Sequence, residues 1–435
     1  MNVPFTKSTL ANGLDVIVHE DHAAPLVAVS IWYHVGSKDE QPGRTGLAHL
    51  FEHLMFEGSA HQPRGYFAPL QEAGALLNGS TSADRTNYWE LVPKDAARLA
   101  LWMEADRMGW LLPALSAERF EAQRGVVLNE RRQSYENRPY GLAQFALMDA
   151  IFPADHPYHW PTIGSPADLA AASLDDVRGF FTRYYHPGNA SLVVAGDIAT
   201  AQAMSWAQEL FGEIPAGEPV PRLPPDVPGA RAKRLVLEDR VELARLYLCW
   251  PSPPLFAAGD AELDLFADLV ANGRTSRLYR RLIHDRRVAV ELAAGQSSRE
   301  LCGTFQIVAT AAPGHTLDEL HEAITEEIDR FTKAGPTEDE LARGRAQAEA
   351  AFVFRLESLG GSGGKADQLN AYNIYRGEPG WFDQDLSRYL AVTPDVLRSA
   401  VGAWLDPAHS VALSVVPAGR ASMALADAEP IGSVA

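Results

Sequence analysis

Cysteine is scarce in this sequence, and long hydrophobic runs are missing. Two cysteines in 435 residues exclude a small fold held by disulfide bridges. No apolar run approaches about eighteen residues, so the sequence predicts no membrane-spanning helix. The first residues also lack a basic segment followed by an apolar run, the pattern of a secretory signal. We therefore expect a cytoplasmic protein, while a periplasmic location stays open if an N-terminal signal has been removed.

Positively charged residues are also fewer than negatively charged ones. Lysine and arginine number 38 against 56 aspartates and glutamates, which gives a formal net charge of −18. A surface of this sign repels phosphate backbones and anionic lipids, so neither nucleic acid nor a membrane is an expected partner. The hydrophobic share of 46% is ordinary for a globular chain and provides for a large core.

Proline is concentrated at one place near the middle of the chain. Six prolines and two glycines fall within residues 214–229, a composition that excludes helix and central strand. We therefore expect an N-terminal domain over residues 1–214, a proline-rich linker over 215–230 and a C-terminal domain over 231–435. Both halves mix strands with helices, the pattern of an α+β fold.

The two halves resemble one another. A helical pattern begins at Ser173, stops at Pro187 and is followed by a β-rich run, and the same order recurs from Thr393 to Pro407. Both pairs of markers are offset by 220 residues. Chance similarity stays an alternative, but the common offset favours duplication. The predicted fold is two homologous lobes, each a mainly antiparallel sheet with helices packed on one face.

Hydrophobic periodicity gives a coarse set of elements. The runs 14–19 and 26–34 are predicted as a pair of neighbouring strands. Predicted helices cover residues 45–56, 98–110, 117–135 (capped by Ser116), 261–271, 275–284, 317–333 and 338–357. The glycine-rich segment 360–364 cannot be helix interior and is predicted as a hinge or a substrate-contact loop.

The most informative segment is Gly-Leu-Ala-His-Leu-Phe-Glu-His over residues 46–53. On a helix, His49 and His53 lie one turn apart on one face, so both imidazoles can reach a single ion. Glu52 lies at the edge of that face, where it can accept a proton from metal-bound water. Two imidazoles and a carboxylate leave an open position, as in catalytic zinc sites. The alternative is a pair of ordinary core histidines, although burying them unpartnered among apolar neighbours would be costly.

This His-x-x-Glu-His order resembles the inverted zincin signature of the insulinase/pitrilysin zinc peptidases, especially their mitochondrial-processing-peptidase-like branch. The resemblance implies a zinc metalloendopeptidase that binds one Zn²⁺ per chain and acts on peptides or unfolded segments. It makes His49 and His53 zinc ligands and Glu52 the general base. The family's third ligand, a glutamate 77 positions beyond the second histidine, corresponds to Glu130.

Residues 74–88 resemble the family's edge strand, which faces the zinc. An extended peptide can add to such a strand through main-chain hydrogen bonds. An edge strand without function stays the alternative. The resemblance implies substrate contacts at Asn78, Gly79, Ser80 and Thr81.

The sequence departs from the family pattern at two places. Gln123 stands where the family often has a glutamate, and we expect it beside the ligands, able to hydrogen-bond but without charge. In the second lobe, self-sufficient members carry an Arg and a Tyr that hold substrate and oxyanion. This chain has Ile283 and Val290 there, which cannot donate hydrogen bonds.

These departures lead us to expect the catalytic subunit of a heterodimer, in which a homologous subunit supplies the Arg/Tyr pair. A self-sufficient enzyme that uses other residues stays open. A non-catalytic structural or peptide-binding subunit of a processing-peptidase-like complex stays open as well.

Overall fold

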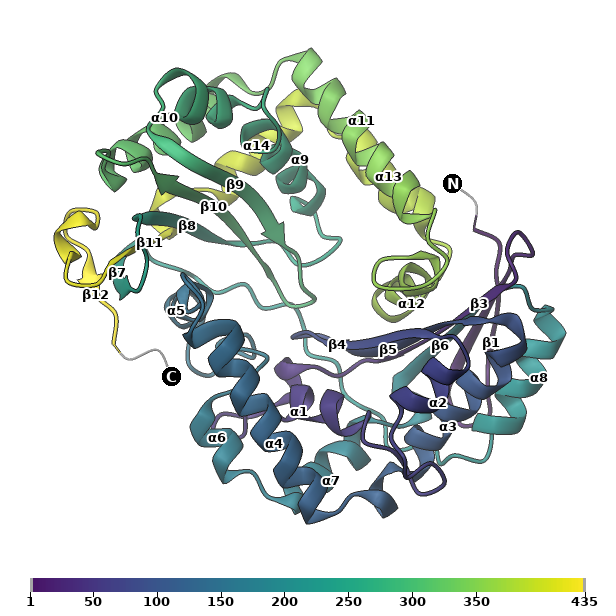
Figure 1. Ribbon diagram of the computed structural model, residues 1–435. Helices are drawn as coiled ribbons and strands as arrows, with labels where there is room; N and C mark the ends of the chain where they lie inside the picture. Colours follow the sequence, from purple (N-terminus) through teal and green to yellow (C-terminus); the bar gives the residue numbers. More distant parts are fainter. Residues whose placement is uncertain (1–2, 433–435) are drawn as a thin grey trace. The chain divides into compact units, whose positions relative to one another are not determined.

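A computed structural model describes residues 3–432 of the chain (Figure 1). These residues form two compact units, each built on one six-stranded sheet. The first unit takes residues up to 130, then 160–222 and 351–384, and the second takes 131–159, 223–350 and the chain from 385 onward. The chain therefore passes between the units five times.

The first sheet has the strand order β1-β2-β6-β3-β5-β4. The prediction that residues 14–19 and 26–34 are neighbouring strands is wrong. Both are strands, but β6, from much later in the chain, pairs in parallel with β2 and antiparallel with β3 and so separates them. The strands are β1 (Thr6–Thr9), β2 (Asp15–Glu20), β3 (Leu26–Tyr33), β4 (Leu76–Thr81), β5 (Thr86–Pro93) and β6 (Ala190–Gly196).

Helices of the first unit cover its sheet and frame one end of it (Figure 1). The predicted helices 45–56, 98–110 and 117–135 are confirmed as α1, α3 and α4 within a few residues, and α4 continues into a π-helical turn, Arg132–Glu136. The helices are α1 (Leu47–Leu54), α2 (Phe67–Glu72), α3 (Ala97–Ala114), α4 (Ala117–Arg131), α6 (Pro166–Ala171), α7 (Leu174–Tyr184), α8 (Thr200–Phe211) and α12 (Lys365–Arg376).

The second sheet has the order β12-β7-β11-β8-β10-β9. Its strands are β7 (Lys233–Asp239), β8 (Arg245–Ser252), β9 (Ala289–Ser297), β10 (Gly303–Ala311), β11 (Val411–Pro417) and β12 (Glu429–Pro430). The remaining helices are α5 (Ala143–Ile151), α9 (Asp260–Val270), α10 (Leu317–Ala334), α11 (Glu338–Arg355), α13 (Phe382–Leu390) and α14 (Pro394–Trp404), with a π-helical turn at Tyr279–Asp285.

The two sheets repeat one topology. In each, the strand after the 220-residue marker (β6 or β11) pairs in parallel with an early strand of its half (β2 or β7) and antiparallel with the strand that follows it (β3 or β8). The markers themselves correspond, since Ser173 and Thr393 are the side-chain N-caps of α7 and α14. The predicted fold of two similar α+β lobes is confirmed.

Each sheet also receives a helix from the other half of the chain. In the first unit, α12 packs on β6 and β3, on the face opposite α3 and α8 (Figure 1). Its contacts are polar: Trp32 Nε1 donates to Asp367 (2.8 Å), and Asn370 Nδ2 donates to the carbonyl of Ser30 (3.0 Å). In the second unit, α5 packs on β11 and β8 in the corresponding way.

The predicted domain boundaries therefore divide the strands but not all the helices. Strands β1–β6 lie within residues 1–214 and β7–β12 within 231–435, whereas the compact units exchange residues 131–159 and 351–384. Residues 215–230 contain no helix or strand and are mostly exposed, as the proline content predicts.

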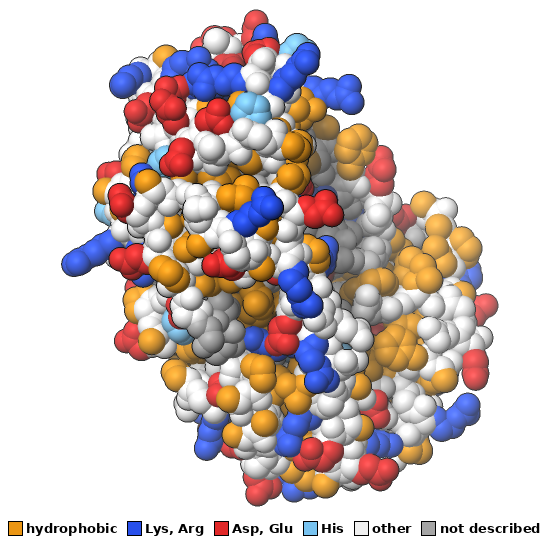
Figure 2. All heavy atoms as spheres, turned by 60° about the vertical axis from the view of Figure 1, so that its left-hand side comes forward, with side chains coloured by type: hydrophobic (Ala, Val, Ile, Leu, Met, Phe, Trp, Pro, Cys, Tyr) orange, Lys and Arg blue, Asp and Glu red, His pale blue; other side chains and the backbone are white. Residues whose placement is uncertain are grey.

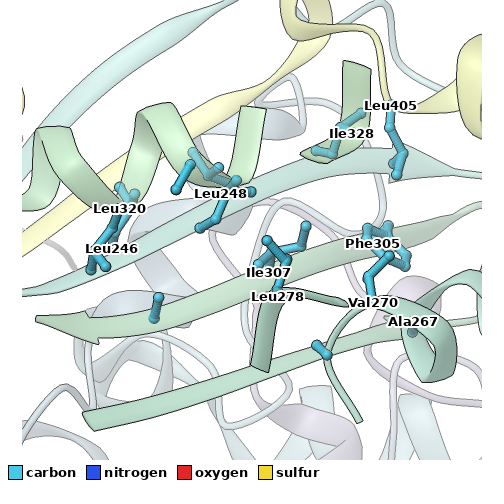
Figure 3. Packing of buried hydrophobic residues seen from close by; sticks show 14 of the residues in the cluster. Leu246, Leu248, Ala267, Val270, Leu278, Phe305, Ile307, Leu320, Ile328 and Leu405 are labelled. Carbon is cyan, nitrogen blue, oxygen red and sulfur yellow. The ribbon is translucent and has the colours of Figure 1, made fainter. Parts of the chain in front are cut away.

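The core of the second unit lies between β8, β10 and the helices α9, α10 and α14 (Figure 3). Alternate residues of β8 and β10 enter it, among them Leu246, Leu248, Phe305 and Ile307. The surface carries both signs of charge, mixed over the face drawn in Figure 2. Among residues 3–432, no helix is both long enough and apolar enough to cross a membrane.

Candidate metal centre

Helix α1 carries the three polar residues of the motif because its apolar side is anchored. Leu47, Leu50, Phe51 and Leu54 are buried. The Phe51 ring packs against Phe180 and Tyr185 at the end of α7, with ring centroids 5.9 and 5.1 Å apart. The 3.6-residue period then leaves His49, Glu52 and His53 on the part of the helix that is not fully buried.

The structure brings Glu130 to the two histidines. Its Oε2 lies 3.2 Å from Nε2 of His53 and 3.8 Å from Nε2 of His49. The two imidazole rings are 4.9 Å apart at a steep angle of 82°. One ligand atom from each residue falls within 4.8 Å of the others, and among the described residues this is the one group of at least three His, Cys, Asp or Glu side chains so arranged.

Helix α4 positions Glu130. The helix begins after Ser116, whose Oγ accepts a hydrogen bond from the backbone N–H of Arg119 (3.2 Å), as the predicted cap requires. Phe120 and Val127 are buried and fix the helix against the unit. Gln123 lies on the same helix, and its amide donates to Glu57 Oε1 (2.5 Å), just beyond the motif helix, rather than to a zinc-ligand candidate.

Burial shifts the pKa values of two residues of the motif, His49 and Glu52. It lowers the pKa of His49 to about 3, with the neighbouring His53 adding to the effect, so the imidazole is neutral and offers a lone pair. Burial also raises the pKa of Glu52, although a hydrogen bond from Thr81 Oγ1 to Oε2 (2.6 Å) opposes the rise. Two imidazoles and a carboxylate whose ligand atoms converge within one ion's reach fit the donor set of catalytic zinc.

The predicted substrate strand is β4, which lies at the edge of the sheet and, within residues 3–432, pairs with β5 alone. Gly79 is packed tightly: a Cβ there would lie 2.9 Å from Tyr88 and 3.1 Å from Phe56. Ser80 Oγ donates to Asn87 (2.7 Å), while the next residue, Thr81, donates to Glu52. Thr81, predicted as a substrate contact, therefore also reaches the proposed general base, which the sequence did not indicate.

A pocket of about 320 Å³ lies beside the motif. The sequence did not predict this pocket. Phe56 and Glu57, which lie shortly after the motif helix, were the residues that could have indicated it. The rings of Phe56 and Phe67 stack with centroids 4.7 Å apart and form its apolar wall. Its lining comprises Glu52, His53, Phe56, Glu57, Phe67, Asn78 and Gln123.

The two positions that replace the Arg/Tyr pair lie in the second unit. Ile283 is partly buried and packs against that unit's hydrophobic core. Val290 is on β9, the last strand of the second sheet, and is 51% exposed. The nearby Arg286 and Arg287 are exposed.

Two family models match the chain: Insulinase (Peptidase family M16) over residues 15–157, and Peptidase M16 inactive domain over residues 171–348. Together they cover most of both halves. The chain belongs to the M16 peptidase family. The His-x-x-Glu-His motif and Glu130 lie within residues 15–157, which match the Insulinase model. Ile283 and Val290 lie within residues 171–348, which match the "inactive domain" model.

Individual M16 relatives agree with this assignment. The chain is 29% identical to the zinc protease PqqE of Helicobacter pylori over 80% of each protein, and 24% identical to an uncharacterised zinc protease of Streptomyces coelicolor over 90% of this chain and 85% of that one. A solved protease from Helicobacter pylori shares the fold, with a TM-score of 0.88 at 24% identity over 96% of this chain and 100% of that one.

Proposed function

We propose that this M16 chain is a zinc-dependent endopeptidase that hydrolyses peptides or unfolded segments. The observation that carries the proposal is the convergence of His49, His53 and Glu130 within 4.8 Å, directly beside a half-buried carboxylate, Glu52. Three ligand groups with a neighbouring general base form the constellation that metal-assisted hydrolysis needs.

His49, His53 and Glu130 would hold the zinc ion. When bound, zinc would lower the pKa of a water molecule and polarise the carbonyl of the scissile bond. Glu52 accepts the proton of the attacking water and later gives it to the leaving amine. Because Thr81 donates to Oε2 of Glu52, Oε1 is the more basic of the two oxygens and the better proton acceptor.

Strand β4 and the pocket supply the means to hold a peptide. The outer edge of β4 has no partner strand among the described residues, so an extended substrate can add there. Asn78 belongs to both β4 and the pocket lining, so a side chain of the bound peptide can enter the pocket and pack against its Phe56 and Phe67 wall. Strand addition requires an extended backbone, which folded domains do not offer.

We also propose that the chain works as the catalytic subunit of a heterodimer, as in the processing-peptidase-like branch. Ile283 is committed to the core of the second unit, and Val290 has no hydrogen-bonding group in its side chain. A homologous partner would supply the missing Arg/Tyr pair, which would stabilise the oxyanion.

A non-catalytic, peptide-binding subunit is the second candidate. The match of residues 171–348 to a model described as an inactive domain favours it. The two candidates differ in turnover, since only the first predicts chelator-sensitive cleavage.

The test is hydrolysis of an internally quenched peptide library, with zinc and with chelator, by the wild type and by Glu52→Gln. With a homologous partner present, we expect wild-type cleavage that stops with chelator, and a variant that binds one zinc ion without turnover. Cleavage by the chain alone would contradict the heterodimer. One zinc bound but no cleavage, even with a homologous partner, would favour the second candidate. Loss of zinc in Glu52→Gln would make Glu52 a ligand.

A further inference from the structure

The N-cap residue of helix α1 provides no side-chain hydrogen bond to the first turn of the helix. The helix is only eight residues long, Leu47–Leu54, and it carries all three polar residues of the motif. Its N-cap is Gly46, in the left-handed region at φ 92°, which has no side chain to accept a hydrogen bond. The backbone N–H groups of a first turn have no partner within the helix, so they need acceptors from elsewhere.

Glu40 supplies those acceptors from the preceding loop. Its Oε2 accepts the N–H of Gly46 at 2.9 Å, and its Oε1 accepts the N–H of Ala48 at 2.8 Å. The side chain is nearly inaccessible, with 7% exposure for the residue. Burial raises the pKa of Glu40 to about 8, although the N–H groups of Ala48 and Gly46 oppose the rise. Where it is ionised, the carboxylate also interacts favourably with the positive end of the helix dipole.

The segment that enters α1 is fixed from a second side. Thr45 donates to Asp168 Oδ2 from both its backbone N–H (3.0 Å) and its Oγ1 (2.6 Å). Gly164 approaches so closely that a Cβ there would lie 2.4 Å from the Cα of Gly46. With the approach to the helix locked in this way, the two bonds of Glu40 fix the orientation of the first turn itself.

We propose that Glu40 is a positioning residue for the metal centre. It holds the amides on either side of Leu47, and the second of these, Ala48, directly precedes His49. Removing its carboxylate frees the first turn, so that His49 loses its alignment with His53 and Glu130. The inference rests on the proposed function only in taking these three residues as the zinc ligands; it does not require peptide cleavage.

The experiment measures zinc affinity by competition with a chromophoric chelator, at fixed pH, for the wild type, Glu40→Gln and Glu40→Ala. Loss of groups that orient metal ligands typically weakens metal binding about 10- to 100-fold, which is the loss we expect for Glu40→Ala. The zinc affinity of Glu40→Gln should lie between those of the wild type and Glu40→Ala. Its side-chain oxygen still accepts one backbone N–H, while its NH₂ group faces the other N–H donor.

Thr393→Ala is the matched control. It removes the cap of α14, whose Oγ1 accepts the N–H of Val396 at 3.3 Å, on a helix of the second unit that carries no ligand candidate. Thermal unfolding of the metal-free proteins gives each variant's loss of stability. We expect Thr393→Ala to lose stability with unchanged zinc affinity, and both Glu40 variants to lose zinc affinity.

Wild-type zinc affinity in Glu40→Gln together with reduced stability would overturn the proposal, because Glu40 would then be an ordinary structural cap. Glu40→Gln decides the question if Glu40→Ala does not fold. Zinc binding by a wild type that cleaves no peptide, even with a homologous partner, would overturn only the catalytic proposal. A wild type that binds no zinc would overturn both.

Discussion

Thr81 ties the end of β4 to the carboxylate that we propose as the general base. Its hydroxyl donates to Oε2 of Glu52 at 2.6 Å, and that bond opposes the rise in the Glu52 pKa caused by burial. A hydroxyl in this position orients the carboxylate and stabilises its charged form. Thr81 therefore connects β4, the strand expected to bind substrate, to Glu52, the residue expected to accept the proton.

The near-isosteric change Thr81→Val tests that link. A hydrogen bond to a charged group contributes about 1.5–3 kcal/mol, so its loss should lower kcat/KM by about 10- to 100-fold. The Glu52 pKa should rise, which moves the acid limb of the pH–rate profile to higher pH. Zinc stoichiometry should not change. Thr182→Val is the control, since the hydroxyl of Thr182 donates to the carbonyl of Arg178 on α7, outside the site (2.9 Å). Equal activity in Thr81→Val and Thr182→Val would contradict the role.

Residue spacing predicts the site only where its members are neighbours in sequence. His49, Glu52 and His53 share one helical turn, so their spacing alone brings them together. Glu130 was reached only through resemblance to a family, because nothing in a helix glutamate indicates a partner 77 residues away. Glu40 was missed, since a glutamate in a polar loop is most often a solvated surface charge.

At the scale of elements, sequence patterns predict which segments are helices or strands better than they predict their neighbours. The strands β2 and β3 follow one another in the chain, but β6 lies between them. Half of the buried residues of α12 are polar, with Asp367, Asn370 and Asn373 bonded to the first sheet. In the sequence, such a face is indistinguishable from one exposed to solvent.

Asp264, which joins two helices of the second unit, should make the free energy of unfolding depend on pH. Tyr389 Oη donates to Asp264 Oδ2 at 2.7 Å, joining the end of α13 to α9. Burial raises the pKa of Asp264 to about 7, with Asp260 and Asp268 adding like charge. Because the folded-state pKa exceeds the unfolded value, the stabilisation is complete below about pH 4 and is lost as pH rises through 7.

Asp264→Asn tests this expectation. The amide cannot ionise, so the variant should lose the part of the pH dependence between pH 4 and 8, amounting to about 4 kcal/mol at most for the wild type. Denaturant unfolding of both proteins at several pH values measures the difference. Parallel stability–pH curves for the two proteins would show that Asp264 ionises in the folded state as it does in the unfolded one.

For the whole molecule, the exchange of segments between the units matters more than the proline linker. The half before the linker contains α5, which packs on the second sheet, and the half after it contains α12, which packs on the first. Each half of the chain therefore lacks a helix that its own sheet needs. The linker marks the midpoint of the duplication, but it does not mark a boundary at which two self-contained parts can be separated.

A protease site inserted after Pro219, in the exposed linker, tests this interpretation. After cleavage, the two fragments should co-elute on gel filtration under native conditions and separate only in denaturant. As a control, the fragment 1–219 produced alone should aggregate, because the sheet face under α12 is uncovered. Fragments that separate on simple dilution would show that the exchanged helices contribute little to stability.

The same exchange bears on how the protein is made. The last strand of the first sheet ends at Gly196, whereas α12, which covers that sheet, ends 180 residues later at Arg376. A ribosome that adds about 5–20 residues per second needs on the order of ten to forty seconds to bridge that interval. Throughout it, the nascent chain presents a complete sheet with one bare face. We expect such a chain to depend on trigger-factor-like or Hsp70-like chaperones until its C-terminal half emerges.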